Sequence, residues 1–358
     1  MKHALLFCLA LLFIPLFSSD ADAGDVIVRD TLSLRIAIRD LKPDQVIKIA
    51  PGVYSGNNYV NNAERVTFEA LVPTDKPVIQ GGATGLQFVR CNNLTLRNLK
   101  FQGQTDNGLN LDDGGQFDRP VVGITLENIE VNDVGPKGNF DGIKCSGLDN
   151  LVIRNCTVNG WGGDGIDMVG CHNALITGCK FIAKTGFSTT TGVQVKGGSS
   201  DIIIENGQFT NISERPINVG GITDLNMFRP SGAKYEARRI TVRGNTFTGA
   251  PCATAFVGVD GAEFTNNTIL FPTKWIFRIL QENTAPGMVP CRNVLIKNNK
   301  IVFLRSQVQT EVNIGAGTEP KTFRFEGNRW FAQDKPSASK PSLPTVEIGG
   351  TYGIDPRK

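Results

Sequence analysis

The sequence predicts an all-β fold in which short strands stack as the rungs of a solenoid, a parallel β-helix. Three observations support this prediction. Residues 142–156 and 165–179 carry one pattern twice, at an offset of 23 residues. Units of a small residue, alternating apolar positions and an Asn- or Gly-containing bend recur along the chain. Gly occurs 40 times in 358 residues, well above the usual ~7%. Such a unit cannot bury its own apolar face, but stacked units form continuous inward columns.

The N-terminus has the pattern of a secretory signal peptide over residues 1–23. Lys2 and His3 precede an apolar run from residue 4 to 17, and 21–23 form a small-x-small cleavage pattern. This run is too short to span a membrane, and no other apolar run is longer. We therefore expect a secreted or periplasmic protein that does not insert into a membrane.

Residues 24–62 are predicted to form an N-terminal cap and the first strands. Leu32, Leu34 and Ile36 belong to a short amphipathic segment, which suits the atypical terminal unit that a solenoid needs to cover its core. The parallel β-helix itself is predicted over 63–332. Residues 333–358 form a tail, with a Pro/Ser/Lys-rich linker at 334–344 before a closing strand.

Two insertions exceed the rung length, at 114–121 and 222–239. Insertions in solenoids cluster on one side and often line the binding face. A further recurring feature is an Asn at the bend of each rung, which we expect to stack in an Asn ladder. These residues are Asn98, Asn128, Asn155, Asn206, Asn266 and Asn298.

Alternate side chains of each strand point out of the stack, which places residues of successive rungs in columns. One predicted outward column reads Gln87, Asn110, Lys144, Asp167, Gln194, Asn218, Ala255, Arg278 and Asn313. Mixed acidic, basic and amide groups on a flat sheet suit a long polar polymer. Outward residues of any solenoid are also polar simply because they meet water. The alternative that this column reflects solvent exposure alone, and not substrate binding, stays open.

Composition excludes several functions. The net charge is +3 and the sequence contains no run of basic residues, so we expect no nucleic-acid partner. We also expect the protein to be a monomer. The sequence contains no CxxC pair, so we expect no zinc site. His172 is the sole histidine after signal cleavage, which excludes a His dyad and favours a turn role. Cys252 and Cys291 are a candidate disulfide.

Lys196 is the leading catalytic candidate. A lysine acts as a general base when burial or positive neighbours lower its pKa. Arg215, Arg229 and Arg238 lie on the following turn and insertion and can supply that charge or bind a substrate carboxylate. The alternative is a solvated surface lysine. The candidate substrate-binding residues are Lys144, Asp167, Gln194, Asn218, Tyr235 and Arg278.

Three aspartates, Asp141, Asp164 and Asp167, have two chemical interpretations. A carboxylate pair can hydrolyse a glycosidic bond, or Asp167 and Gln194 can bind calcium. Asp-Gly is also a common turn pair. We therefore interpret Asp141 and Asp164 as turn residues and Asp167 as the functional carboxylate.

The chain resembles the secreted right-handed parallel β-helix superfamily that contains pectate lyases, over roughly residues 25–332. Within it the chain is similar to the alginate lyase and chondroitinase B family, through "PDQVIKIAPGVYSG", "KPVIQGG" and a Lys before "DIIIENGQF". It is also similar to bacterial β-helix proteins bearing "KGGSSDI" and "MFRP". The resemblance implies a right-handed helix, with Lys196 as the base that removes the proton α to a uronate carboxylate and an Arg as its partner.

Two positions depart from that family. Its Arg-His-Gly is replaced by Asn218-Val219-Gly220, and Gln194 stands where the family offers glutamates for calcium. "DGID" at 164–167 is similar to polygalacturonase-type hydrolases, whose later motifs are missing here.

We expect a polysaccharide lyase that cleaves a uronic-acid-containing polymer by β-elimination, with Lys196 as base and Arg215 or Arg229 assisting the leaving group. A calcium ion is the one cofactor considered. The alternatives are a glycoside hydrolase or epimerase on an acidic polysaccharide, and a non-catalytic carbohydrate-binding protein.

Overall fold

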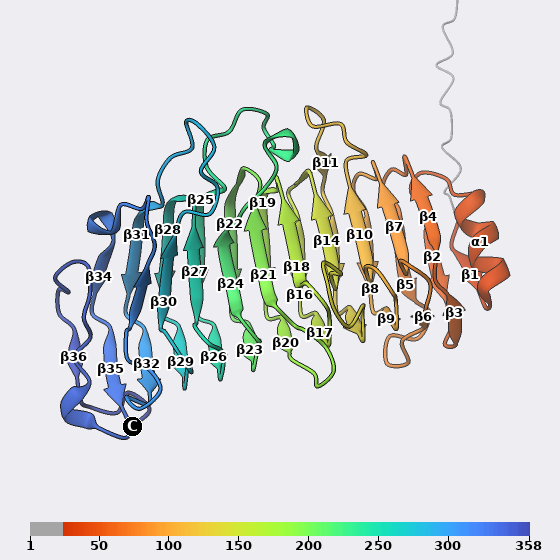
Figure 1. Ribbon diagram of the computed structural model, residues 1–358. Helices are drawn as coiled ribbons and strands as arrows, with labels where there is room; N and C mark the ends of the chain where they lie inside the picture. Colours follow the sequence, from red (N-terminus) through yellow and green to blue (C-terminus); the bar gives the residue numbers. More distant parts are fainter. Residues whose placement is uncertain (1–23) are drawn as a thin grey trace, which may run out of the picture.

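The computed structural model describes residues 24–358, and the predicted signal peptide, residues 1–23, lies outside the described residues. Three long parallel sheets run along one axis and enclose a single apolar core (Figure 1). Every pairing between strands of consecutive rungs is parallel, as in Lys144 opposite Asp167. The predicted parallel β-helix is therefore confirmed. Within residues 24–358, no helix is long and apolar enough to cross a membrane.

The strands are grouped here by sheet. Sheet A contains β1 (Val26–Val28), β2 (Val46–Ile49), β5 (Thr67–Ala70), β8 (Thr95–Arg97), β12 (Thr125–Glu127), β16 (Val152–Arg154), β19 (His172–Thr177), β22 (Ser199–Glu205), β25 (Ala237–Arg243), β28 (Val259–Thr265), β31 (Arg292–Lys297) and β34 (Arg324–Glu326), with β11 (Val121–Val122) and β15 (Leu148–Asp149) at its side. Sheet B contains β3 (Val53–Ser55), β6 (Val78–Gln80), β9 (Lys100–Gln102), β13 (Glu130–Asn132), β17 (Thr157–Asn159), β20 (Lys180–Ile182), β23 (Gln208–Thr210), β26 (Thr246–Thr248), β29 (Thr268–Leu270), β32 (Lys300–Phe303), β35 (Arg329–Ala332) and β36 (Thr351–Tyr352). Sheet C contains β4 (Asn58–Asn61), β7 (Leu86–Val89), β10 (Leu109–Asp112), β14 (Ile143–Ser146), β18 (Asp164–Val169), β21 (Thr191–Lys196), β24 (Arg215–Gly220), β27 (Thr254–Val257), β30 (Phe277–Leu280) and β33 (Val312–Ile314).

A helix covers the N-terminal end of the core. Helix α1 (Thr31–Arg39) starts at Asp30, whose side chain accepts a hydrogen bond from the Ser33 amide at 2.7 Å. Its residues Leu34 and Ala37 are buried against the first rungs. The amphipathic segment is thus the cap that a solenoid needs to keep water from its open end.

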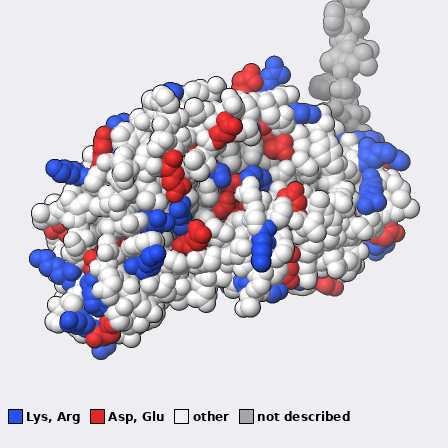
Figure 2. Space-filling view, viewed as in Figure 1, with Lys and Arg blue, Asp and Glu red and all other residues white. Residues whose placement is uncertain are grey.

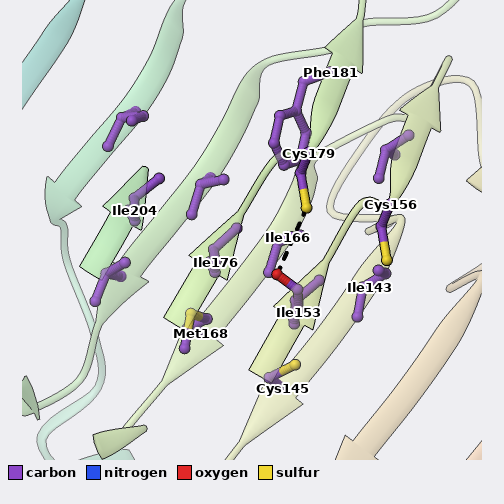
Figure 3. Close-up of a cluster of buried hydrophobic side chains, with 14 of the residues drawn as sticks. Ile143, Cys145, Ile153, Cys156, Ile166, Met168, Ile176, Cys179, Phe181 and Ile204 are labelled. Carbon is purple, nitrogen blue, oxygen red and sulfur yellow. Dashed lines mark hydrogen bonds between the residues drawn. The ribbon is translucent and has the colours of Figure 1, made fainter. Parts of the chain in front are cut away.

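Inward side chains of successive rungs stack on one another through the core. In Figure 3, Ile143 of β14 and Ile166 of β18 belong to one column, and Phe181 of β20 continues another. Phe181, Phe209 and Phe247 stack with ring centroids 4.7 and 5.1 Å apart. Offset aromatic stacking of this kind adds to the apolar burial that holds the rungs together.

The predicted Asn ladder forms in part at the bend positions that the sequence singled out, where the Asn128 amide donates to the Asn98 Oδ1 at 2.6 Å. The bend residues Asn206, Asn266 and Asn298 have positive φ angles of 55–56°, a left-handed conformation that Asn adopts readily. A second, buried ladder lies one residue after the bend positions of the later rungs and consists of Asn245, Asn267, Asn299 and Asn328. In each step the Oδ1 of one ladder Asn accepts a hydrogen bond from the backbone N–H of the preceding ladder Asn.

The C-terminal tail closes the other end of the helix. Strand β36 pairs with β35, which confirms the predicted closing strand. Glu347 of the tail accepts hydrogen bonds from Asn328 at 2.8 Å and from the Trp330 indole at 2.9 Å. The tail therefore ends the Asn ladder with a carboxylate. Short 3-10 turns at Pro320–Thr322 and Pro336–Ala338 lie nearby in the chain.

The candidate disulfide is wrong, because Cys252 and Cys291 are both free thiols buried in the structure. They lie in different environments: the Cys252 thiol contacts the Glu214 carbonyl and the Cys291 thiol contacts the Phe256 carbonyl. Burial raises the pKa of both thiols to about 12. They behave as small apolar core residues.

Both predicted insertions project on one side of the helix, where they meet. The Arg229 guanidinium of the second insertion donates two hydrogen bonds, of 2.6 and 2.9 Å, to Asp113 at the start of the first. The second insertion also contains a 3-10 turn at Leu225–Met227. A third long connection, residues 281–291 between β30 and β31, lies on the same side and was not predicted (Figure 1).

The buried ladder generates a stability prediction. The side chain of each ladder Asn is both a donor and an acceptor, and neither Asp nor Ala can replace both groups. Asn267→Ala therefore leaves the Asn245 N–H and the Val242 carbonyl without their partners. An unpaired buried polar group costs about 1–3 kcal/mol. We expect the free energy of unfolding, measured by urea denaturation, to fall by at least about 2 kcal/mol.

The matched control is Asn266→Gly at the adjacent exposed bend. Gly adopts the left-handed φ without strain, so this change is expected to alter stability by about 0.5 kcal/mol or less. Equal losses in the two variants would contradict the assignment of the ladder to the buried residue.

Candidate functional site

The outward column predicted on sheet C has the predicted register. Lys144 lies opposite Asp167, Asp167 opposite Gln194, and Gln194 opposite Asn218. The column continues through Ala255, Arg278 and Asn313. Lys196 follows Val169 in the neighbouring outward column. The fold thus places residues far apart in the sequence at rung spacing, about 4.8 Å.

Three carboxyl groups meet at the centre of this face. Asp141 directly precedes Gly142 and strand β14, and Asp164 and Asp167 belong to β18. One oxygen from each lies within 4.8 Å of the other two, and all three side chains are buried. Asp141 also accepts a hydrogen bond from the Asp164 backbone N–H at 2.9 Å.

Two lysines neutralise this cluster. The Lys144 ammonium donates to Asp141 at 3.1 Å and also contacts Asp167 directly. The Lys196 ammonium lies 3.4 Å from the other Asp167 oxygen. In the amide orientation that satisfies its neighbours, Gln194 donates to both Asp164 oxygens at 3.2 Å and accepts from Lys196 at 3.0 Å. Figure 2 shows basic and acidic side chains next to one another near the middle of the molecule.

The environment raises the pKa of two of these carboxyl groups, Asp164 and Asp141. Burial raises the pKa of Asp164 well above its ordinary value, the charges of Asp167 and Asp141 raise it further, and Lys196 opposes them. Burial and Asp167 also raise the pKa of Asp141. For Lys144, burial acts to lower the pKa, but the two carboxylates outweigh it and the pKa is raised. Asp164 and Asp141 therefore take up a proton more readily than ordinary carboxyl groups do.

Asp164 opens onto a pocket on the outward face of sheet C. The pocket has a volume of about 440 Å³, and its walls include Asp164, Gln194, Lys196, Arg215, Asn218 and Glu282. Arg215 donates to Glu282 at 2.9 Å and to Asn218 at 3.3 Å. The pocket thus combines a carboxyl group with a raised pKa, two basic side chains and a second acidic side chain.

A larger groove, of about 610 Å³, lies elsewhere, over the outer face of β25, β28, β31 and β34 in sheet A. Its walls include Glu263 and Arg324, whose side chains are exposed and belong to no buried cluster of charged groups. Perturbed titratable groups that converge in a cleft mark functional sites better than volume does. The pocket on sheet C is therefore the candidate site.

Six of the residues that the sequence singled out come together here: Lys144, Asp167, Gln194, Lys196, Arg215 and Asn218. Arg278 lies farther along the column, where its guanidinium stacks 4.6 Å from the Trp275 ring centre and donates to Asn313 at 3.0 Å. Burial and the charge of Arg215 lower the pKa of Arg278. Arg278 therefore extends the positive side of the pocket.

Two predicted residues do not join the pocket. Arg229 is buried in its ion pair with Asp113, with its guanidinium 4.2 Å from the Phe117 ring centre. Tyr235 is also buried, under the Arg238 guanidinium at 4.5 Å. Both side chains hold the second insertion in place, because the insertion folds back onto the helix and buries them.

Sequence reasoning missed Asp164 and Glu282. Asp164 was interpreted as a turn residue, although it and Asp141 precede the same Gly in consecutive rungs and so share a column with Thr191 and Arg215. That repetition was a usable signal. Glu282 lies in the unpredicted connection after β30 and carries no motif. His172 begins β19 and contacts Ser200 at 3.0 Å, away from the pocket.

The residues do not fit the calcium ion considered from the sequence. Calcium needs several ionised or carbonyl oxygens around an open centre. Here the Lys144 ammonium lies between Asp141 and Asp167 and supplies the positive charge. Gln194 is engaged by Asp164 and Lys196. No reaction step is therefore assigned to a metal.

Comparison with known proteins agrees with the fold. A family model described as the right-handed β-helix region matches residues 84–269, more than half of the chain. No curated protein matches the sequence significantly. The predicted superfamily is thereby confirmed, including the right-handed sense of the helix.

Three solved structures are similar to this chain. An alginate lyase from Paenibacillus sp. str. FPU-7 has 17% identity and a TM-score of 0.57, over 81% of this chain and 97% of the lyase. The catalytic unit of a GH87 α-1,3-glucanase from Streptomyces thermodiastaticus strain HF3-3 has 16% identity and a TM-score of 0.61, over 90% of this chain and 65% of the glucanase chain. The A-module of a mannuronan C-5 epimerase from Azotobacter vinelandii has 12% identity and a TM-score of 0.59, over 92% of this chain and 97% of the epimerase chain. At these identities the likeness shows the fold alone.

The raised pKa of Asp164 makes stability depend on pH. A buried carboxyl group with a raised pKa stabilises the fold fully below its unfolded pKa, about 4, and this contribution is lost as the pH rises through the folded pKa. Asp164→Asn cannot ionise, so it avoids that loss. We expect its melting temperature relative to wild type to increase by about 2 °C or more between pH 4 and pH 7.

The control is Asp75→Asn, at an exposed turn residue. Its melting temperature should differ from wild type by the same small amount at both pH values. A difference between Asp164→Asn and wild type that is constant or shrinks with rising pH would show that Asp164 ionises normally.

Proposed function

Because the chain belongs to the right-handed β-helix family, we propose that it is a carbohydrate-active enzyme that cleaves an acidic polysaccharide at the pocket on sheet C, by hydrolysis with Asp164 as general acid. One observation carries this proposal: a buried carboxyl group with a raised pKa lines the same pocket as a second carboxylate, Glu282. Glycoside hydrolysis uses such a pair, with one group protonated and the other ionised.

The shape and charge of the face support a polymeric, acidic substrate. Sheet C presents a long outward surface with polar columns, so a polysaccharide can contact several rungs at once. Arg215 and Arg278 lie near each other on its C-terminal half, and Arg215 forms an ion pair with Glu282. A guanidinium binds a sugar carboxylate in a bidentate manner. The similar solved structures include, by their names, proteins that act on alginate, mannuronan and α-1,3-glucan.

In this mechanism Asp164 donates its proton to the glycosidic oxygen of the leaving sugar. General acid catalysis of this kind contributes about 10²–10⁴ in rate. Glu282, held by Arg215 at 2.9 Å, accepts the proton of the attacking water. Asp164 and Arg215 belong to strands β18 and β24, which lie two rungs apart on the same face, so the acid and the Arg215-bound Glu282 line the pocket from different rungs.

Asp167, the carboxylate favoured from the sequence, takes a different role in this proposal. Its side chain is fully buried beneath Lys144 and Lys196, so a sugar cannot reach it directly. Its charge holds both lysines in place and raises the pKa of Asp164. It is a positioning residue in this mechanism.

β-Elimination at a uronic acid is the second candidate, because Lys196 and Arg215 line the same pocket. Arg215 would bind the uronate carboxylate, Lys196 would remove the α-proton, and Asp164 would donate its proton to the leaving glycosidic oxygen. The Lys196 Nζ lies 3.4 Å from an Asp167 oxygen, so it is engaged by a carboxylate rather than free to approach a substrate proton. This contact places elimination second. In both cases we propose that the protein acts outside the cytoplasm, since residues 1–23 have the pattern of a signal peptide.

The test is turnover on a panel of acidic polysaccharides, followed both as new reducing ends and as the ultraviolet absorbance of unsaturated uronates. Wild type should release reducing ends without that absorbance. Asp164→Asn should lower the rate by about 10²–10⁴, while Asp75→Asn should not. A chelator should leave the rate unchanged, because lysines supply the charge at the cluster.

Other outcomes assign other functions. An ultraviolet signal that Lys196→Ala abolishes would establish elimination and overturn hydrolysis. Isomerised sugar without cleavage would identify an epimerase. Binding of a polysaccharide without any turnover would identify a non-catalytic carbohydrate-binding protein.

A further inference from the structure

A glutamate outside the pocket connects three of its walls. Glu236 lies in the second insertion, directly before β25, and its side chain is fully buried. Its carboxylate accepts hydrogen bonds from the Gly197 N–H at 3.0 Å, the Thr223 N–H at 2.9 Å and the Asn283 side-chain amide at 2.7 Å. The Thr223 hydroxyl donates a fourth, at 2.7 Å.

Each of these partners is the immediate neighbour of a residue that lines the pocket. Gly197 follows Lys196, Thr223 follows Ile222, and Asn283 follows Glu282. The three segments come from the end of β21, the second insertion and the connection after β30. They are far apart in the sequence and have no strand pairing that joins all three. Glu236 is the group that links them.

The hydrogen bonding of this carboxylate is complete. A carboxylate accepts at about four positions and donates at none, and Glu236 receives four donors. Among residues 24–358, no lysine or arginine forms an ion pair with it. A buried carboxyl group that relies on backbone, hydroxyl and side-chain amide donors alone requires all of them to stay in place. The bonds to Glu236 therefore fix the relative positions of the three segments.

The packing around the second insertion agrees with this role. Gly221 lies against the pocket residues: a Cβ there would approach the Gln194 amide to 2.9 Å and the Lys196 Cδ to 3.4 Å. The backbone of Glu236 itself bonds to Gly198 and Gly258 at 2.9 Å each. A shift of the carboxylate would thus be transmitted to Lys196 from two sides.

We propose that Glu236 is the positioning residue of the site, which holds Lys196, Ile222 and Glu282 in one arrangement around the substrate. This inference rests on the proposed function for its catalytic consequence, but the coupling of the three segments does not. Side chains that catalyse a reaction need such fixed support, because small displacements lower the rate strongly.

The test variant is Glu236→Gln, which keeps the shape of the side chain. Its amide NH₂ must face a donor, either Gly197 or Thr223, so at least one bond is lost and the carboxylate charge is removed. The matched control is Glu263→Gln, at an exposed glutamate on the outer face of β28.

Hydrogen–deuterium exchange without substrate tests the coupling itself. In Glu236→Gln, peptides covering 196–199, 222–224 and 282–285 should all exchange about tenfold faster than in wild type, while peptides from β7 and β10 stay unchanged. Faster exchange in only one of the three segments, or in none, would overturn the inference whatever the activity proves to be.

Kinetics test the catalytic consequence. In Glu236→Gln, kcat per folded molecule should fall about ten- to hundredfold with a much smaller change in KM. The alkaline limb of the pH–rate profile should also move to higher pH, because Lys196 lowers the pKa of Asp164 and a displaced Lys196 does so less. A role in stability alone would leave kcat per folded molecule and the profile unchanged, which would overturn the proposal.

If Glu236→Gln does not fold, Thr223→Val and Asn283→Ala each remove one donor and leave the carboxylate in place. Either variant should speed exchange in all three segments, more weakly than Glu236→Gln. Absence of turnover in wild type would refute the proposed function and leave the exchange result as the test of the coupling.

Discussion

In each of the three sheets, backbone hydrogen bonds between consecutive rungs fix which residue lies above which. Lys144, Asp167, Gln194 and Asn218 share one column only because the strands that carry them pair in parallel at a single register. A slip of one residue would turn each of these side chains into the core and bring its apolar neighbours out. The inward columns hold the register, since every rung buries its apolar residues against the next. The candidate site is therefore a consequence of how the core packs.

This register also concentrates charge in a way that costs free energy. Asp141, Asp164 and Asp167 are brought within 4.8 Å of one another and out of water. Buried carboxylates persist when they are paired or protonated. Lys144 and Lys196 lie against this cluster of three acids, and burial together with the neighbouring carboxylates raises the pKa of Asp164. Asp164 lines the pocket, where a carboxyl group with a raised pKa is useful as a general acid.

The remaining walls come from long connections rather than from the rungs. The second insertion and the connection after β30 reach the pocket with Ile222 and Glu282. Loops of this length have no intrinsic reason to hold one position. The Asp113–Arg229 ion pair fixes the outer part of the insertion, and Glu236 fixes its return to β25. The rigid helix and the tethered loops together give the pocket a defined shape.

The sequence by itself determined the repeat, the parallel β-helix, the cap and tail, and the outward column with its order of residues, because all of these follow from the period of apolar positions along the chain. It indicated Lys196 and Arg215 as neighbours for the same reason. Only the tertiary structure decided that Asp164 carries the raised pKa, that Arg229 and Tyr235 are buried, and that Glu282 reaches the pocket. Those facts depend on desolvation, on contacts between charges and on the paths of irregular loops. None of these three factors repeats with the period of the apolar positions, so the repeat pattern of the sequence does not predict them.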